Sequence, residues 1–205
     1  MTRKEEIIYA ALELASENGL KAVSLSQIAD RIGIKKPSLY NHFKSKDELI
    51  TEMYTFLREQ AQSSKAVPAD YAALFENRSL EEILLICVSR YLKFLSDKNM
   101  MNFFKVMYSE RCTSAAAAQL MLDETEHMIK ANKALFYALV VHSKMANRDV
   151  DTAAYTYTMA IHSMIDNRMD MVTTGDAQLS DITALTPEIT SFIKWFCERI
   201  GTDEK

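Results

Sequence analysis

The stretch SLSQIADRIGIKKPSLYNHFKSKDELI, residues 24–50, decides the fold of the N-terminal part of this chain. Ser24 is followed three positions later by Gln27, and Ser45 is followed in the same way by Glu48. This spacing is the signature of a capping box, in which the two side chains satisfy free backbone N–H groups at the start of a helix. The stretch therefore predicts that one helix begins after Ser24 and another after Ser45.

Between these two starts, Gly33 and Pro37 predict a turn followed by a further short helix. Gly33 follows the apolar positions of a helix over about 25–32, where a glycine can take the left-handed conformation that ends a helix. Pro37 falls in the first turn of the next helix, where a missing N–H costs little. We expect that helix to end near Phe43 and to bury Leu39 and Phe43. Two short helices joined by a glycine-containing turn form a helix-turn-helix.

Helical signals continue on both sides of this stretch. Thr2 with Glu5 and Ser79 with Glu82 form two further capping-box patterns. Only 4 Gly and 3 Pro interrupt the 205 residues, which favours helices over a turn-rich β fold. Apolar periodicity predicts a loop at 63–70 and helices over 3–18, 25–32, 36–43, 47–63, 79–97, 99–111, 114–144, 150–172 and 187–200.

We therefore predict an all-α protein of about nine helices. A three-helix, helix-turn-helix domain at 1–46 is joined to a larger helical domain at 47–205. Hydrophobic residues make up 48% of the chain and charged residues 25%, which is ordinary for a soluble globular protein. We expect no membrane span, because no apolar run reaches 18 residues, and no secretory signal. Three scattered cysteines without a CxxC pattern predict reduced thiols in a cytoplasmic protein.

Charge is shared unevenly between the two predicted domains. Residues 1–46 hold eight basic and five acidic side chains, a net charge of +3, whereas residues 47–205 hold 16 basic and 23 acidic ones, a net charge of −7. No acid falls among five basic residues in the segment 31–46: Arg31, Lys35, Lys36, Lys44 and Lys46. A basic helix-turn-helix on an acidic body predicts that only this end meets a polyanion, with Ser38 and Asn41 adding directional hydrogen bonds to duplex DNA.

The same residues carry a resemblance to a known family. Residues 24–50 resemble the DNA-binding domain of TetR/AcrR-type transcriptional repressors, and the likeness covers about 50 residues. The positions that fit the family pattern are Ile28, Ala29, Gly33, Leu39, Tyr40, His42, Phe43, Lys46 and Leu49.

The resemblance implies a role in DNA binding for individual residues. Lys36, Pro37 and Ser38 occupy the positions that face base edges. A second group matches positions that hold phosphates, or lies where a helix start favours one: Ser24, Ser26, Tyr40, His42 and Lys46. Lys35 stands where the family often has a capping Ser or Thr, and we expect it to add a phosphate contact instead. For Tyr40, packing of the ring in the core is an alternative.

The resemblance also implies a small, lipophilic effector bound inside the larger domain. The candidates are the aromatic, Met and His residues of its middle helices: Tyr91, Phe94, Phe103, Phe104, Met107, Tyr108, Met121, Phe136, Tyr137 and His162. The alternative for each is an ordinary core position, since aromatic and Met residues at helical spacing usually pack in a core. A second alternative is a regulator controlled by a protein partner that docks on the acidic body, with no small-molecule pocket.

The last two predicted helices look like the dimer interface of the family. Their apolar stripes hold the candidate interface residues Tyr157, Ile161, Met164, Ile165, Arg168, Ile189, Phe192, Ile193 and Phe196. Two such helix pairs would close a four-helix bundle between two chains. The alternative is that the stripes pack within one chain.

The sequence contains no motif that indicates an enzyme. Phosphate-binding, zinc-protease and nucleophile-elbow motifs are absent. Glu124 and His127 match one half of a di-iron site, but no second half follows on a facing helix. We therefore expect no enzyme, cofactor or metal, and predict a homodimeric, ligand-responsive repressor that binds double-stranded operator DNA.

Overall fold

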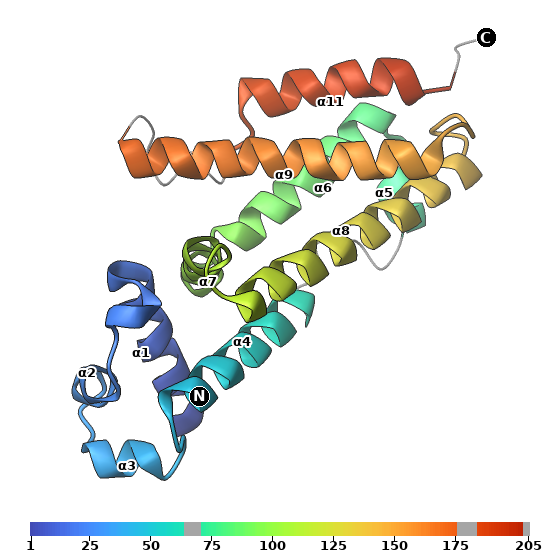
Figure 1. The fold of residues 1–205 in the computed structure, drawn as a ribbon. Helices are drawn as coiled ribbons and strands as arrows, with labels where there is room; N and C mark the ends of the chain where they lie inside the picture. The colour runs from blue at the N-terminus through green and yellow to red at the C-terminus, as the bar shows by residue number, and fades with distance from the viewer. Residues whose placement is uncertain (64–70, 176–183, 203–205) are drawn as a thin grey trace. The chain divides into compact units, whose positions relative to one another are not determined.

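The computed structural model describes residues 1–63, 71–175 and 184–202, and these ranges contain helices but no strand (Figure 1). None of the helices within them is long and apolar enough to cross a membrane. The elements are α1 (Arg3–Asn18), η1 (Leu20–Ala22), α2 (Leu25–Arg31), α3 (Lys36–Tyr40), α4 (Lys46–Ser63), α5 (Tyr71–Phe75), α6 (Leu80–Leu95), α7 (Lys98–Glu110), α8 (Ala115–Val141), α9 (Val150–Thr174) and α11 (Pro187–Ile200).

These elements form two compact units. The first holds α1, η1, α2, α3, α4, α7 and the start of α8 as far as Met121, and the second holds α5, α6, the rest of α8, α9 and α11. The helix-turn-helix thus shares a compact unit with α4 and α7. The predicted domain boundary at residue 46 stays a prediction.

The first unit is organised around α1. Thr2 and Glu5 make both hydrogen bonds of the predicted capping box, and Gly19, with φ of 78°, follows the last residue of the helix. α1 packs against α2, η1, α4 and α7. Its inward side chains Ile7 and Leu12 are fully buried. The helix-turn-helix therefore packs on α1 through α2.

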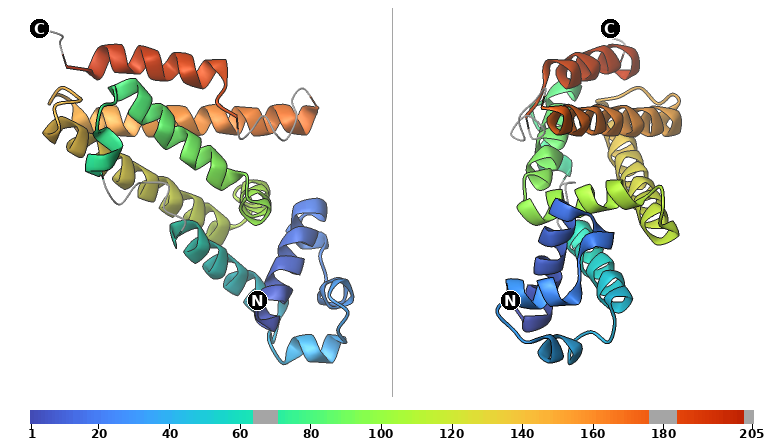
Figure 2. Two further views of the ribbon diagram at one scale, coloured as in Figure 1. Left: turned by 180° about the vertical axis from the view of Figure 1, so that it is seen from behind. Right: turned by 60° about the vertical axis from the view of Figure 1, so that its left-hand side comes forward.

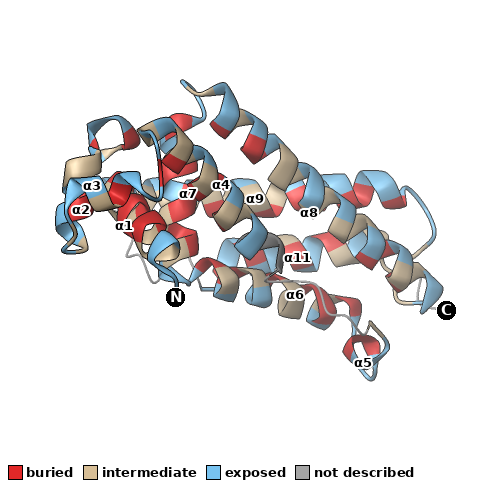
Figure 3. Ribbon diagram, turned by 90° about the horizontal axis from the view of Figure 1, so that it is seen from below, coloured by how far each residue is buried: buried red, intermediate tan, exposed pale blue. Residues whose placement is uncertain are grey.

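In the second unit, α11 packs on α6 and α9, and α9 and α11 run side by side in both views of Figure 2. Four aromatic rings from α8, α9 and α11 form one cluster, with neighbouring ring centroids 5.3–6.1 Å apart: Phe136, Tyr157, Phe192 and Phe196. Buried residues follow stripes along the helices (Figure 3). Burial of these rings removes a large apolar area from water, which is the main stabilising contribution to such a core.

This packing covers most of the residues predicted for the dimer interface, and the interface itself stays a prediction. Six of the nine candidates are buried within the single chain: Tyr157, Ile161, Ile165, Ile189, Ile193 and Phe196. They are covered because α11 packs on α9 and α6 of its own chain, which is the alternative weighed from the sequence. Met164, Arg168 and Phe192 are partly exposed. The large apolar side chains that α9 and α11 expose are instead Tyr155, Met159 and Trp195.

Several predicted helix ends shift by a few residues. α2 ends at Arg31, α3 at Tyr40 and α8 at Val141, each earlier than expected, whereas α9 continues to Thr174. The short helix α5 was not predicted at all. The predicted loop at 63–70 lies almost wholly outside the described residues. Apolar periodicity marks the buried face of a helix but not the last hydrogen-bonded turn, which explains these errors.

Candidate nucleic-acid interface

The short helix α3 has one buried side and one exposed side. Leu39 and Phe43 are fully buried, as predicted, and they anchor the helix and the turn after it. The opposite side exposes the side chains that the sequence assigned to DNA: Lys35, Lys36, Pro37, Tyr40, Asn41 and His42, with Ser38 partly exposed. Tyr40 has 44% of its surface exposed, so its ring is available for contact and does not pack in the core.

The connection between α2 and α3 is built around Gly33. This residue has a φ of 68°, a backbone conformation that residues with a Cβ rarely adopt. Gly33 N–H donates to the Asp30 carbonyl at 3.2 Å, and Ile34 N–H donates to the Ala29 carbonyl at 2.9 Å. Lys35 then precedes α3 with no capping hydrogen bond from its side chain. An ammonium can only donate hydrogen bonds, so Lys35 cannot replace a capping Ser or Thr, and its predicted phosphate contact stays a prediction.

Two of the five basic residues in the segment 31–46 are engaged within the chain. The Lys46 ammonium donates to the backbone carbonyls of Leu20 at 2.8 Å and Lys21 at 3.3 Å. The Arg31 guanidinium forms an ion pair with Glu13, with Nη2 2.7 Å from Oε2. The charges exposed beside α3 are those of Lys35, Lys36 and Lys44.

The role predicted for Lys46 gains a second component from this geometry. An ammonium has three N–H donors, and two of those of Lys46 point at carbonyl oxygens of η1. One donor is left for a phosphate. Lys46 therefore connects the start of α4 to η1, and its predicted phosphate contact stays a prediction.

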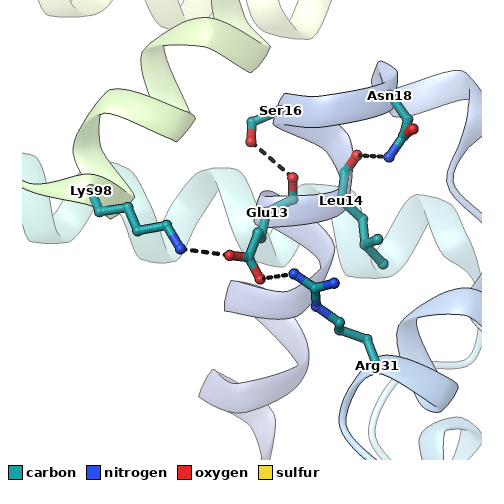
Figure 4. A network of polar contacts seen from close by, with 6 residues as sticks. All are labelled: Glu13, Leu14, Ser16, Asn18, Arg31 and Lys98. Carbon is teal, nitrogen blue, oxygen red and sulfur yellow. Dashed lines mark hydrogen bonds and ion pairs between the residues drawn. The ribbon is translucent and has the colours of Figure 1, made fainter. Parts of the chain in front are cut away.

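Glu13 lies at the centre of a network that the sequence did not reveal (Figure 4). Its second oxygen, Oε1, lies 2.6 Å from Nζ of Lys98, the first residue of α7. Hydrogen bonds from Lys98 and then Arg31 hold the pKa of the Glu13 carboxyl below its usual value, so it is ionised at neutral pH. The partners are 18 and 85 positions away from Glu13. No helical or strand periodicity could have linked them.

The start of α2 uses the predicted serines in different ways. The Ser24 hydroxyl accepts from Gln27 N–H at 3.2 Å and lies 2.8 Å from Gln27 Oε1. Both hydrogen bonds of this capping box are formed. Ser26 is partly exposed on the first turn. Their predicted phosphate contacts stay predictions, and the hydroxyl of Ser24 already serves the helix.

The candidate effector residues fall into both units. In the first unit Phe103, Phe104, Met107 and Met121 are buried and Tyr108 is partly exposed, whereas in the second unit Phe136 is buried, Tyr91, Phe94 and His162 are partly exposed and Tyr137 is exposed. The hydroxyl of Tyr137 donates to Asp151 at 3.2 Å on the surface. Phe136 belongs to the aromatic cluster of the second unit. These two residues thus fit surface and core positions better than a ligand site.

Tyr91 and His162 are brought together, although they come from α6 and α9. The Tyr91 hydroxyl lies 3.3 Å from His162 Nε2, and the two rings are stacked at a centroid distance of 6.3 Å. Burial, followed by the charges of Asp166 and Glu124, raises the pKa of Tyr91 above its usual value. Polar side chains of α8 and α9 therefore act on the hydroxyl of this α6 tyrosine. No group of three metal-ligating side chains occurs among the described residues.

Comparison with known proteins supports the helix-turn-helix assignment. The family described as "Bacterial regulatory proteins, tetR family" matches residues 7–53. The repressor KstR2 of Mycolicibacterium smegmatis is 40% identical over 52 residues, which are 25% of each chain. The activator FasR of the same species is 45% identical over 47 residues, 23% of this chain and 22% of FasR. The class C tetracycline repressor of Escherichia coli is 38% identical over 48 residues, 23% of this chain and 22% of the repressor. Each match spans about a quarter of the relative's length.

Solved structures share the fold over the whole length. A TetR-family regulator from Mesorhizobium loti has a TM-score of 0.73 at 19% identity, covering 98% of this chain and 100% of its own. A transcriptional regulator from Saccharomonospora viridis, solved in complex with choline, has a TM-score of 0.67 at 16% identity, covering 97% of each chain. These likenesses establish the fold beyond the segment that matches in sequence. Residues 7–53 therefore match the helix-turn-helix segment of the tetR family of bacterial regulatory proteins, and the chain as a whole shares the fold of these solved structures.

Proposed function

We propose that the protein is a sequence-specific, DNA-binding transcriptional regulator that acts in the cytoplasm as a homodimer. The observation that carries this proposal is the exposed side of α3, where polar and basic side chains stand on a helix anchored by Leu39 and Phe43. The major groove of duplex DNA is wide enough to admit such a helix. Two copies would read two half-sites of a pseudo-palindromic operator.

The exposed side chains divide by the chemistry they offer. Lys35 and Lys44 present ammonium groups that fit phosphates, which supply affinity for any duplex and make binding depend on salt. Ser38 and Asn41 present hydroxyl and amide groups that fit base edges, which supply preference for sequence.

Fluorescence anisotropy tests this division with two duplexes, one enriched by the protein from a random-sequence pool and one of random sequence. Lys35→Ala should weaken binding to both duplexes and flatten the slope of log affinity against log salt by about 0.9 per contact, or about 1.8 for a dimer. Asn41→Ala should leave that slope unchanged and reduce the preference for the enriched duplex by about 1–3 kcal/mol per contact. A wild-type protein that enriches no sequence and shows no salt-dependent binding would refute the proposal.

We propose repression as the mode of action. Among the relatives compared, KstR2 and the class C tetracycline repressor are repressors, whereas FasR is an activator. Expression of the protein with a reporter placed behind the enriched duplex should lower reporter output. An increase in output would assign it as an activator.

We further propose that a small-molecule effector binds in the second unit and releases the DNA. The Tyr91–His162 pair supports this site, because a hydroxyl from α6 and an imidazole from α9 meet there in a partly buried position. The choline-bound relative has the same fold and holds a small organic molecule. Linkage requires that such an effector stabilise the protein and weaken operator binding, with a coupling of roughly 1–3 kcal/mol.

A thermal-shift screen of small molecules, including lipophilic ones, provides the test. A compound that raises the melting temperature should also lower operator affinity, and Tyr91→Phe or His162→Asn should reduce both effects. A compound that acts equally on wild type and on both variants would place the site elsewhere. If no compound stabilises the fold but a protein that docks on the acidic body does, control by a protein partner is the better account.

A further inference from the structure

The last residue of α2 is joined to α1 by an ion pair with one carboxylate. The buried residues of α2 are Ile28 and Ala29, in the middle of the helix. Its final residue, Arg31, is exposed at the surface and pairs with Glu13 of α1. Ile32 and then Gly33, with its positive φ, follow and lead into α3. The segment that carries α3 therefore leaves α2 at the point where Arg31 is attached.

The other oxygen of the same carboxylate is bound to α7. The distances are 2.7 Å from Oε2 to Arg31 Nη2 and 2.6 Å from Oε1 to Lys98 Nζ (Figure 4). α1, which carries Glu13, packs along α7 and also contacts the short α2. The Glu13 carboxylate therefore binds one side chain from each of these two neighbouring helices. One side chain thus joins three helices that are distant in sequence.

We infer that Glu13 is a positioning residue of the helix-turn-helix, which holds the end of α2, and with it α3, in the orientation that reads DNA. Arg31 acts through Glu13 and is not a phosphate ligand. This inference uses the proposed DNA binding for one of its two readouts, and local motion of α2 for the other.

The exposure of the Glu13 and Arg31 side chains determines how breaking their ion pair should affect the protein. The side chains of Glu13 and Arg31 are 27% and 45% exposed. Ion pairs of this exposure are screened by water and contribute little to the stability of the whole fold. Their effect should appear as the local opening of a short helix that few buried contacts hold, and as a loss of discrimination between DNA sequences.

The key variant is Glu13→Gln, and Glu17→Gln is its matched control. Glu17 lies one turn further along α1, is exposed, and its replacement removes the same charge without breaking either ion pair of Glu13. Comparing the two separates the loss of the bridge from the general gain in DNA affinity that follows the loss of any negative charge.

Hydrogen exchange measures the first readout without DNA. Glu13→Gln should accelerate exchange of the amides of α2 by about 3- to 5-fold relative to those of α1, and Glu17→Gln should not. Equal protection of α2 in both variants would overturn the inference. Because no DNA is present, this result stands even if the proposed function fails.

DNA binding measures the second readout, with the enriched and random duplexes. Glu13→Gln should lower the ratio of enriched to random affinity by up to about 5-fold per half-site, and Arg31→Gln should lower it similarly while leaving the salt slope unchanged. Arg31→Lys, which keeps the charge, should restore most of the ratio. If Arg31→Gln instead flattens the slope by about 1.8 for the dimer, Arg31 is a phosphate ligand and the inference is wrong. A wild-type protein that prefers no duplex would refute the proposed function alone.

Discussion

Replacing Lys46 by Met removes an ammonium from the start of α4 and keeps most of the side-chain stem. The ammonium donates one short hydrogen bond, 2.8 Å to the Leu20 carbonyl, and one long bond, 3.3 Å to the Lys21 carbonyl. A hydrogen bond from a charged donor contributes about 1.5–3 kcal/mol when buried, but the Lys46 side chain is partly exposed and the second bond is long. We therefore expect a loss of about 1–2 kcal/mol, which lowers the melting temperature by about 2–8 °C in a chain of this size.

The same substitution should also affect DNA binding, because the third N–H of the ammonium is left for a phosphate. Losing that contact should flatten the salt slope by about 0.9 per half-site. Lys46→Met should therefore change both melting temperature and slope. A phosphate contact alone, as the family resemblance implies, would change only the slope, and the carbonyl contacts alone would change only the melting temperature.

Lys44→Met is the matched control, since Lys44 lies two residues earlier, is exposed, and loses the same charge. It should flatten the slope and leave the melting temperature within about 1 °C of wild type. Differential scanning fluorimetry and salt titrations on both variants decide the matter. If Lys46→Met has the same melting temperature as the wild type, the carbonyl contacts do not stabilise the fold, and the reasoning from their geometry is refuted.

Three further predictions concern the dimer interface and the cysteine thiols. Trp195, 47% exposed and the sole tryptophan, should lie in the dimer interface. Trp195→Asp should therefore give folded monomers in sedimentation. Ile193→Asp should instead unfold the chain, because Ile193 is fully buried and an unpaired charge there is costly. Folded dimers of either variant would contradict this assignment. Burial raises the pKa of the Cys87 thiol to about 11 and that of the Cys197 thiol to about 12, so at pH 8 a thiol reagent should label exposed Cys112 first. Because the unfolded chain ionises these thiols near pH 9, their contribution to stability is complete below that pH and should be lost as the pH rises through 9 towards 12, which alkaline melting curves can check.

The sequence by itself determined most of the local structure. Three of the four predicted capping boxes, at Thr2, Ser24 and Ser79, form both of their hydrogen bonds, because the two partners are three residues apart and need only their own helix. In the fourth, the Ser45 hydroxyl accepts from Glu48 N–H, but the Glu48 carboxylate accepts from Lys44 N–H and not from Ser45 N–H. Gly33 takes the positive φ that the turn requires, and Leu39 is buried as its spacing indicated. The all-α fold and the helix-turn-helix follow from such short-range rules.

Tertiary structure decided which surfaces and charges are free. Periodicity shows that α9 and α11 each carry an apolar face, but it cannot show that Ile193 is covered by its own chain while Trp195 is exposed. Spacing likewise leaves the partners of Lys46 and Arg31 open, since these lie 18 or more positions away along the chain. Burial and ion pairing depend on which segments meet in space, and the fold as a whole sets those contacts.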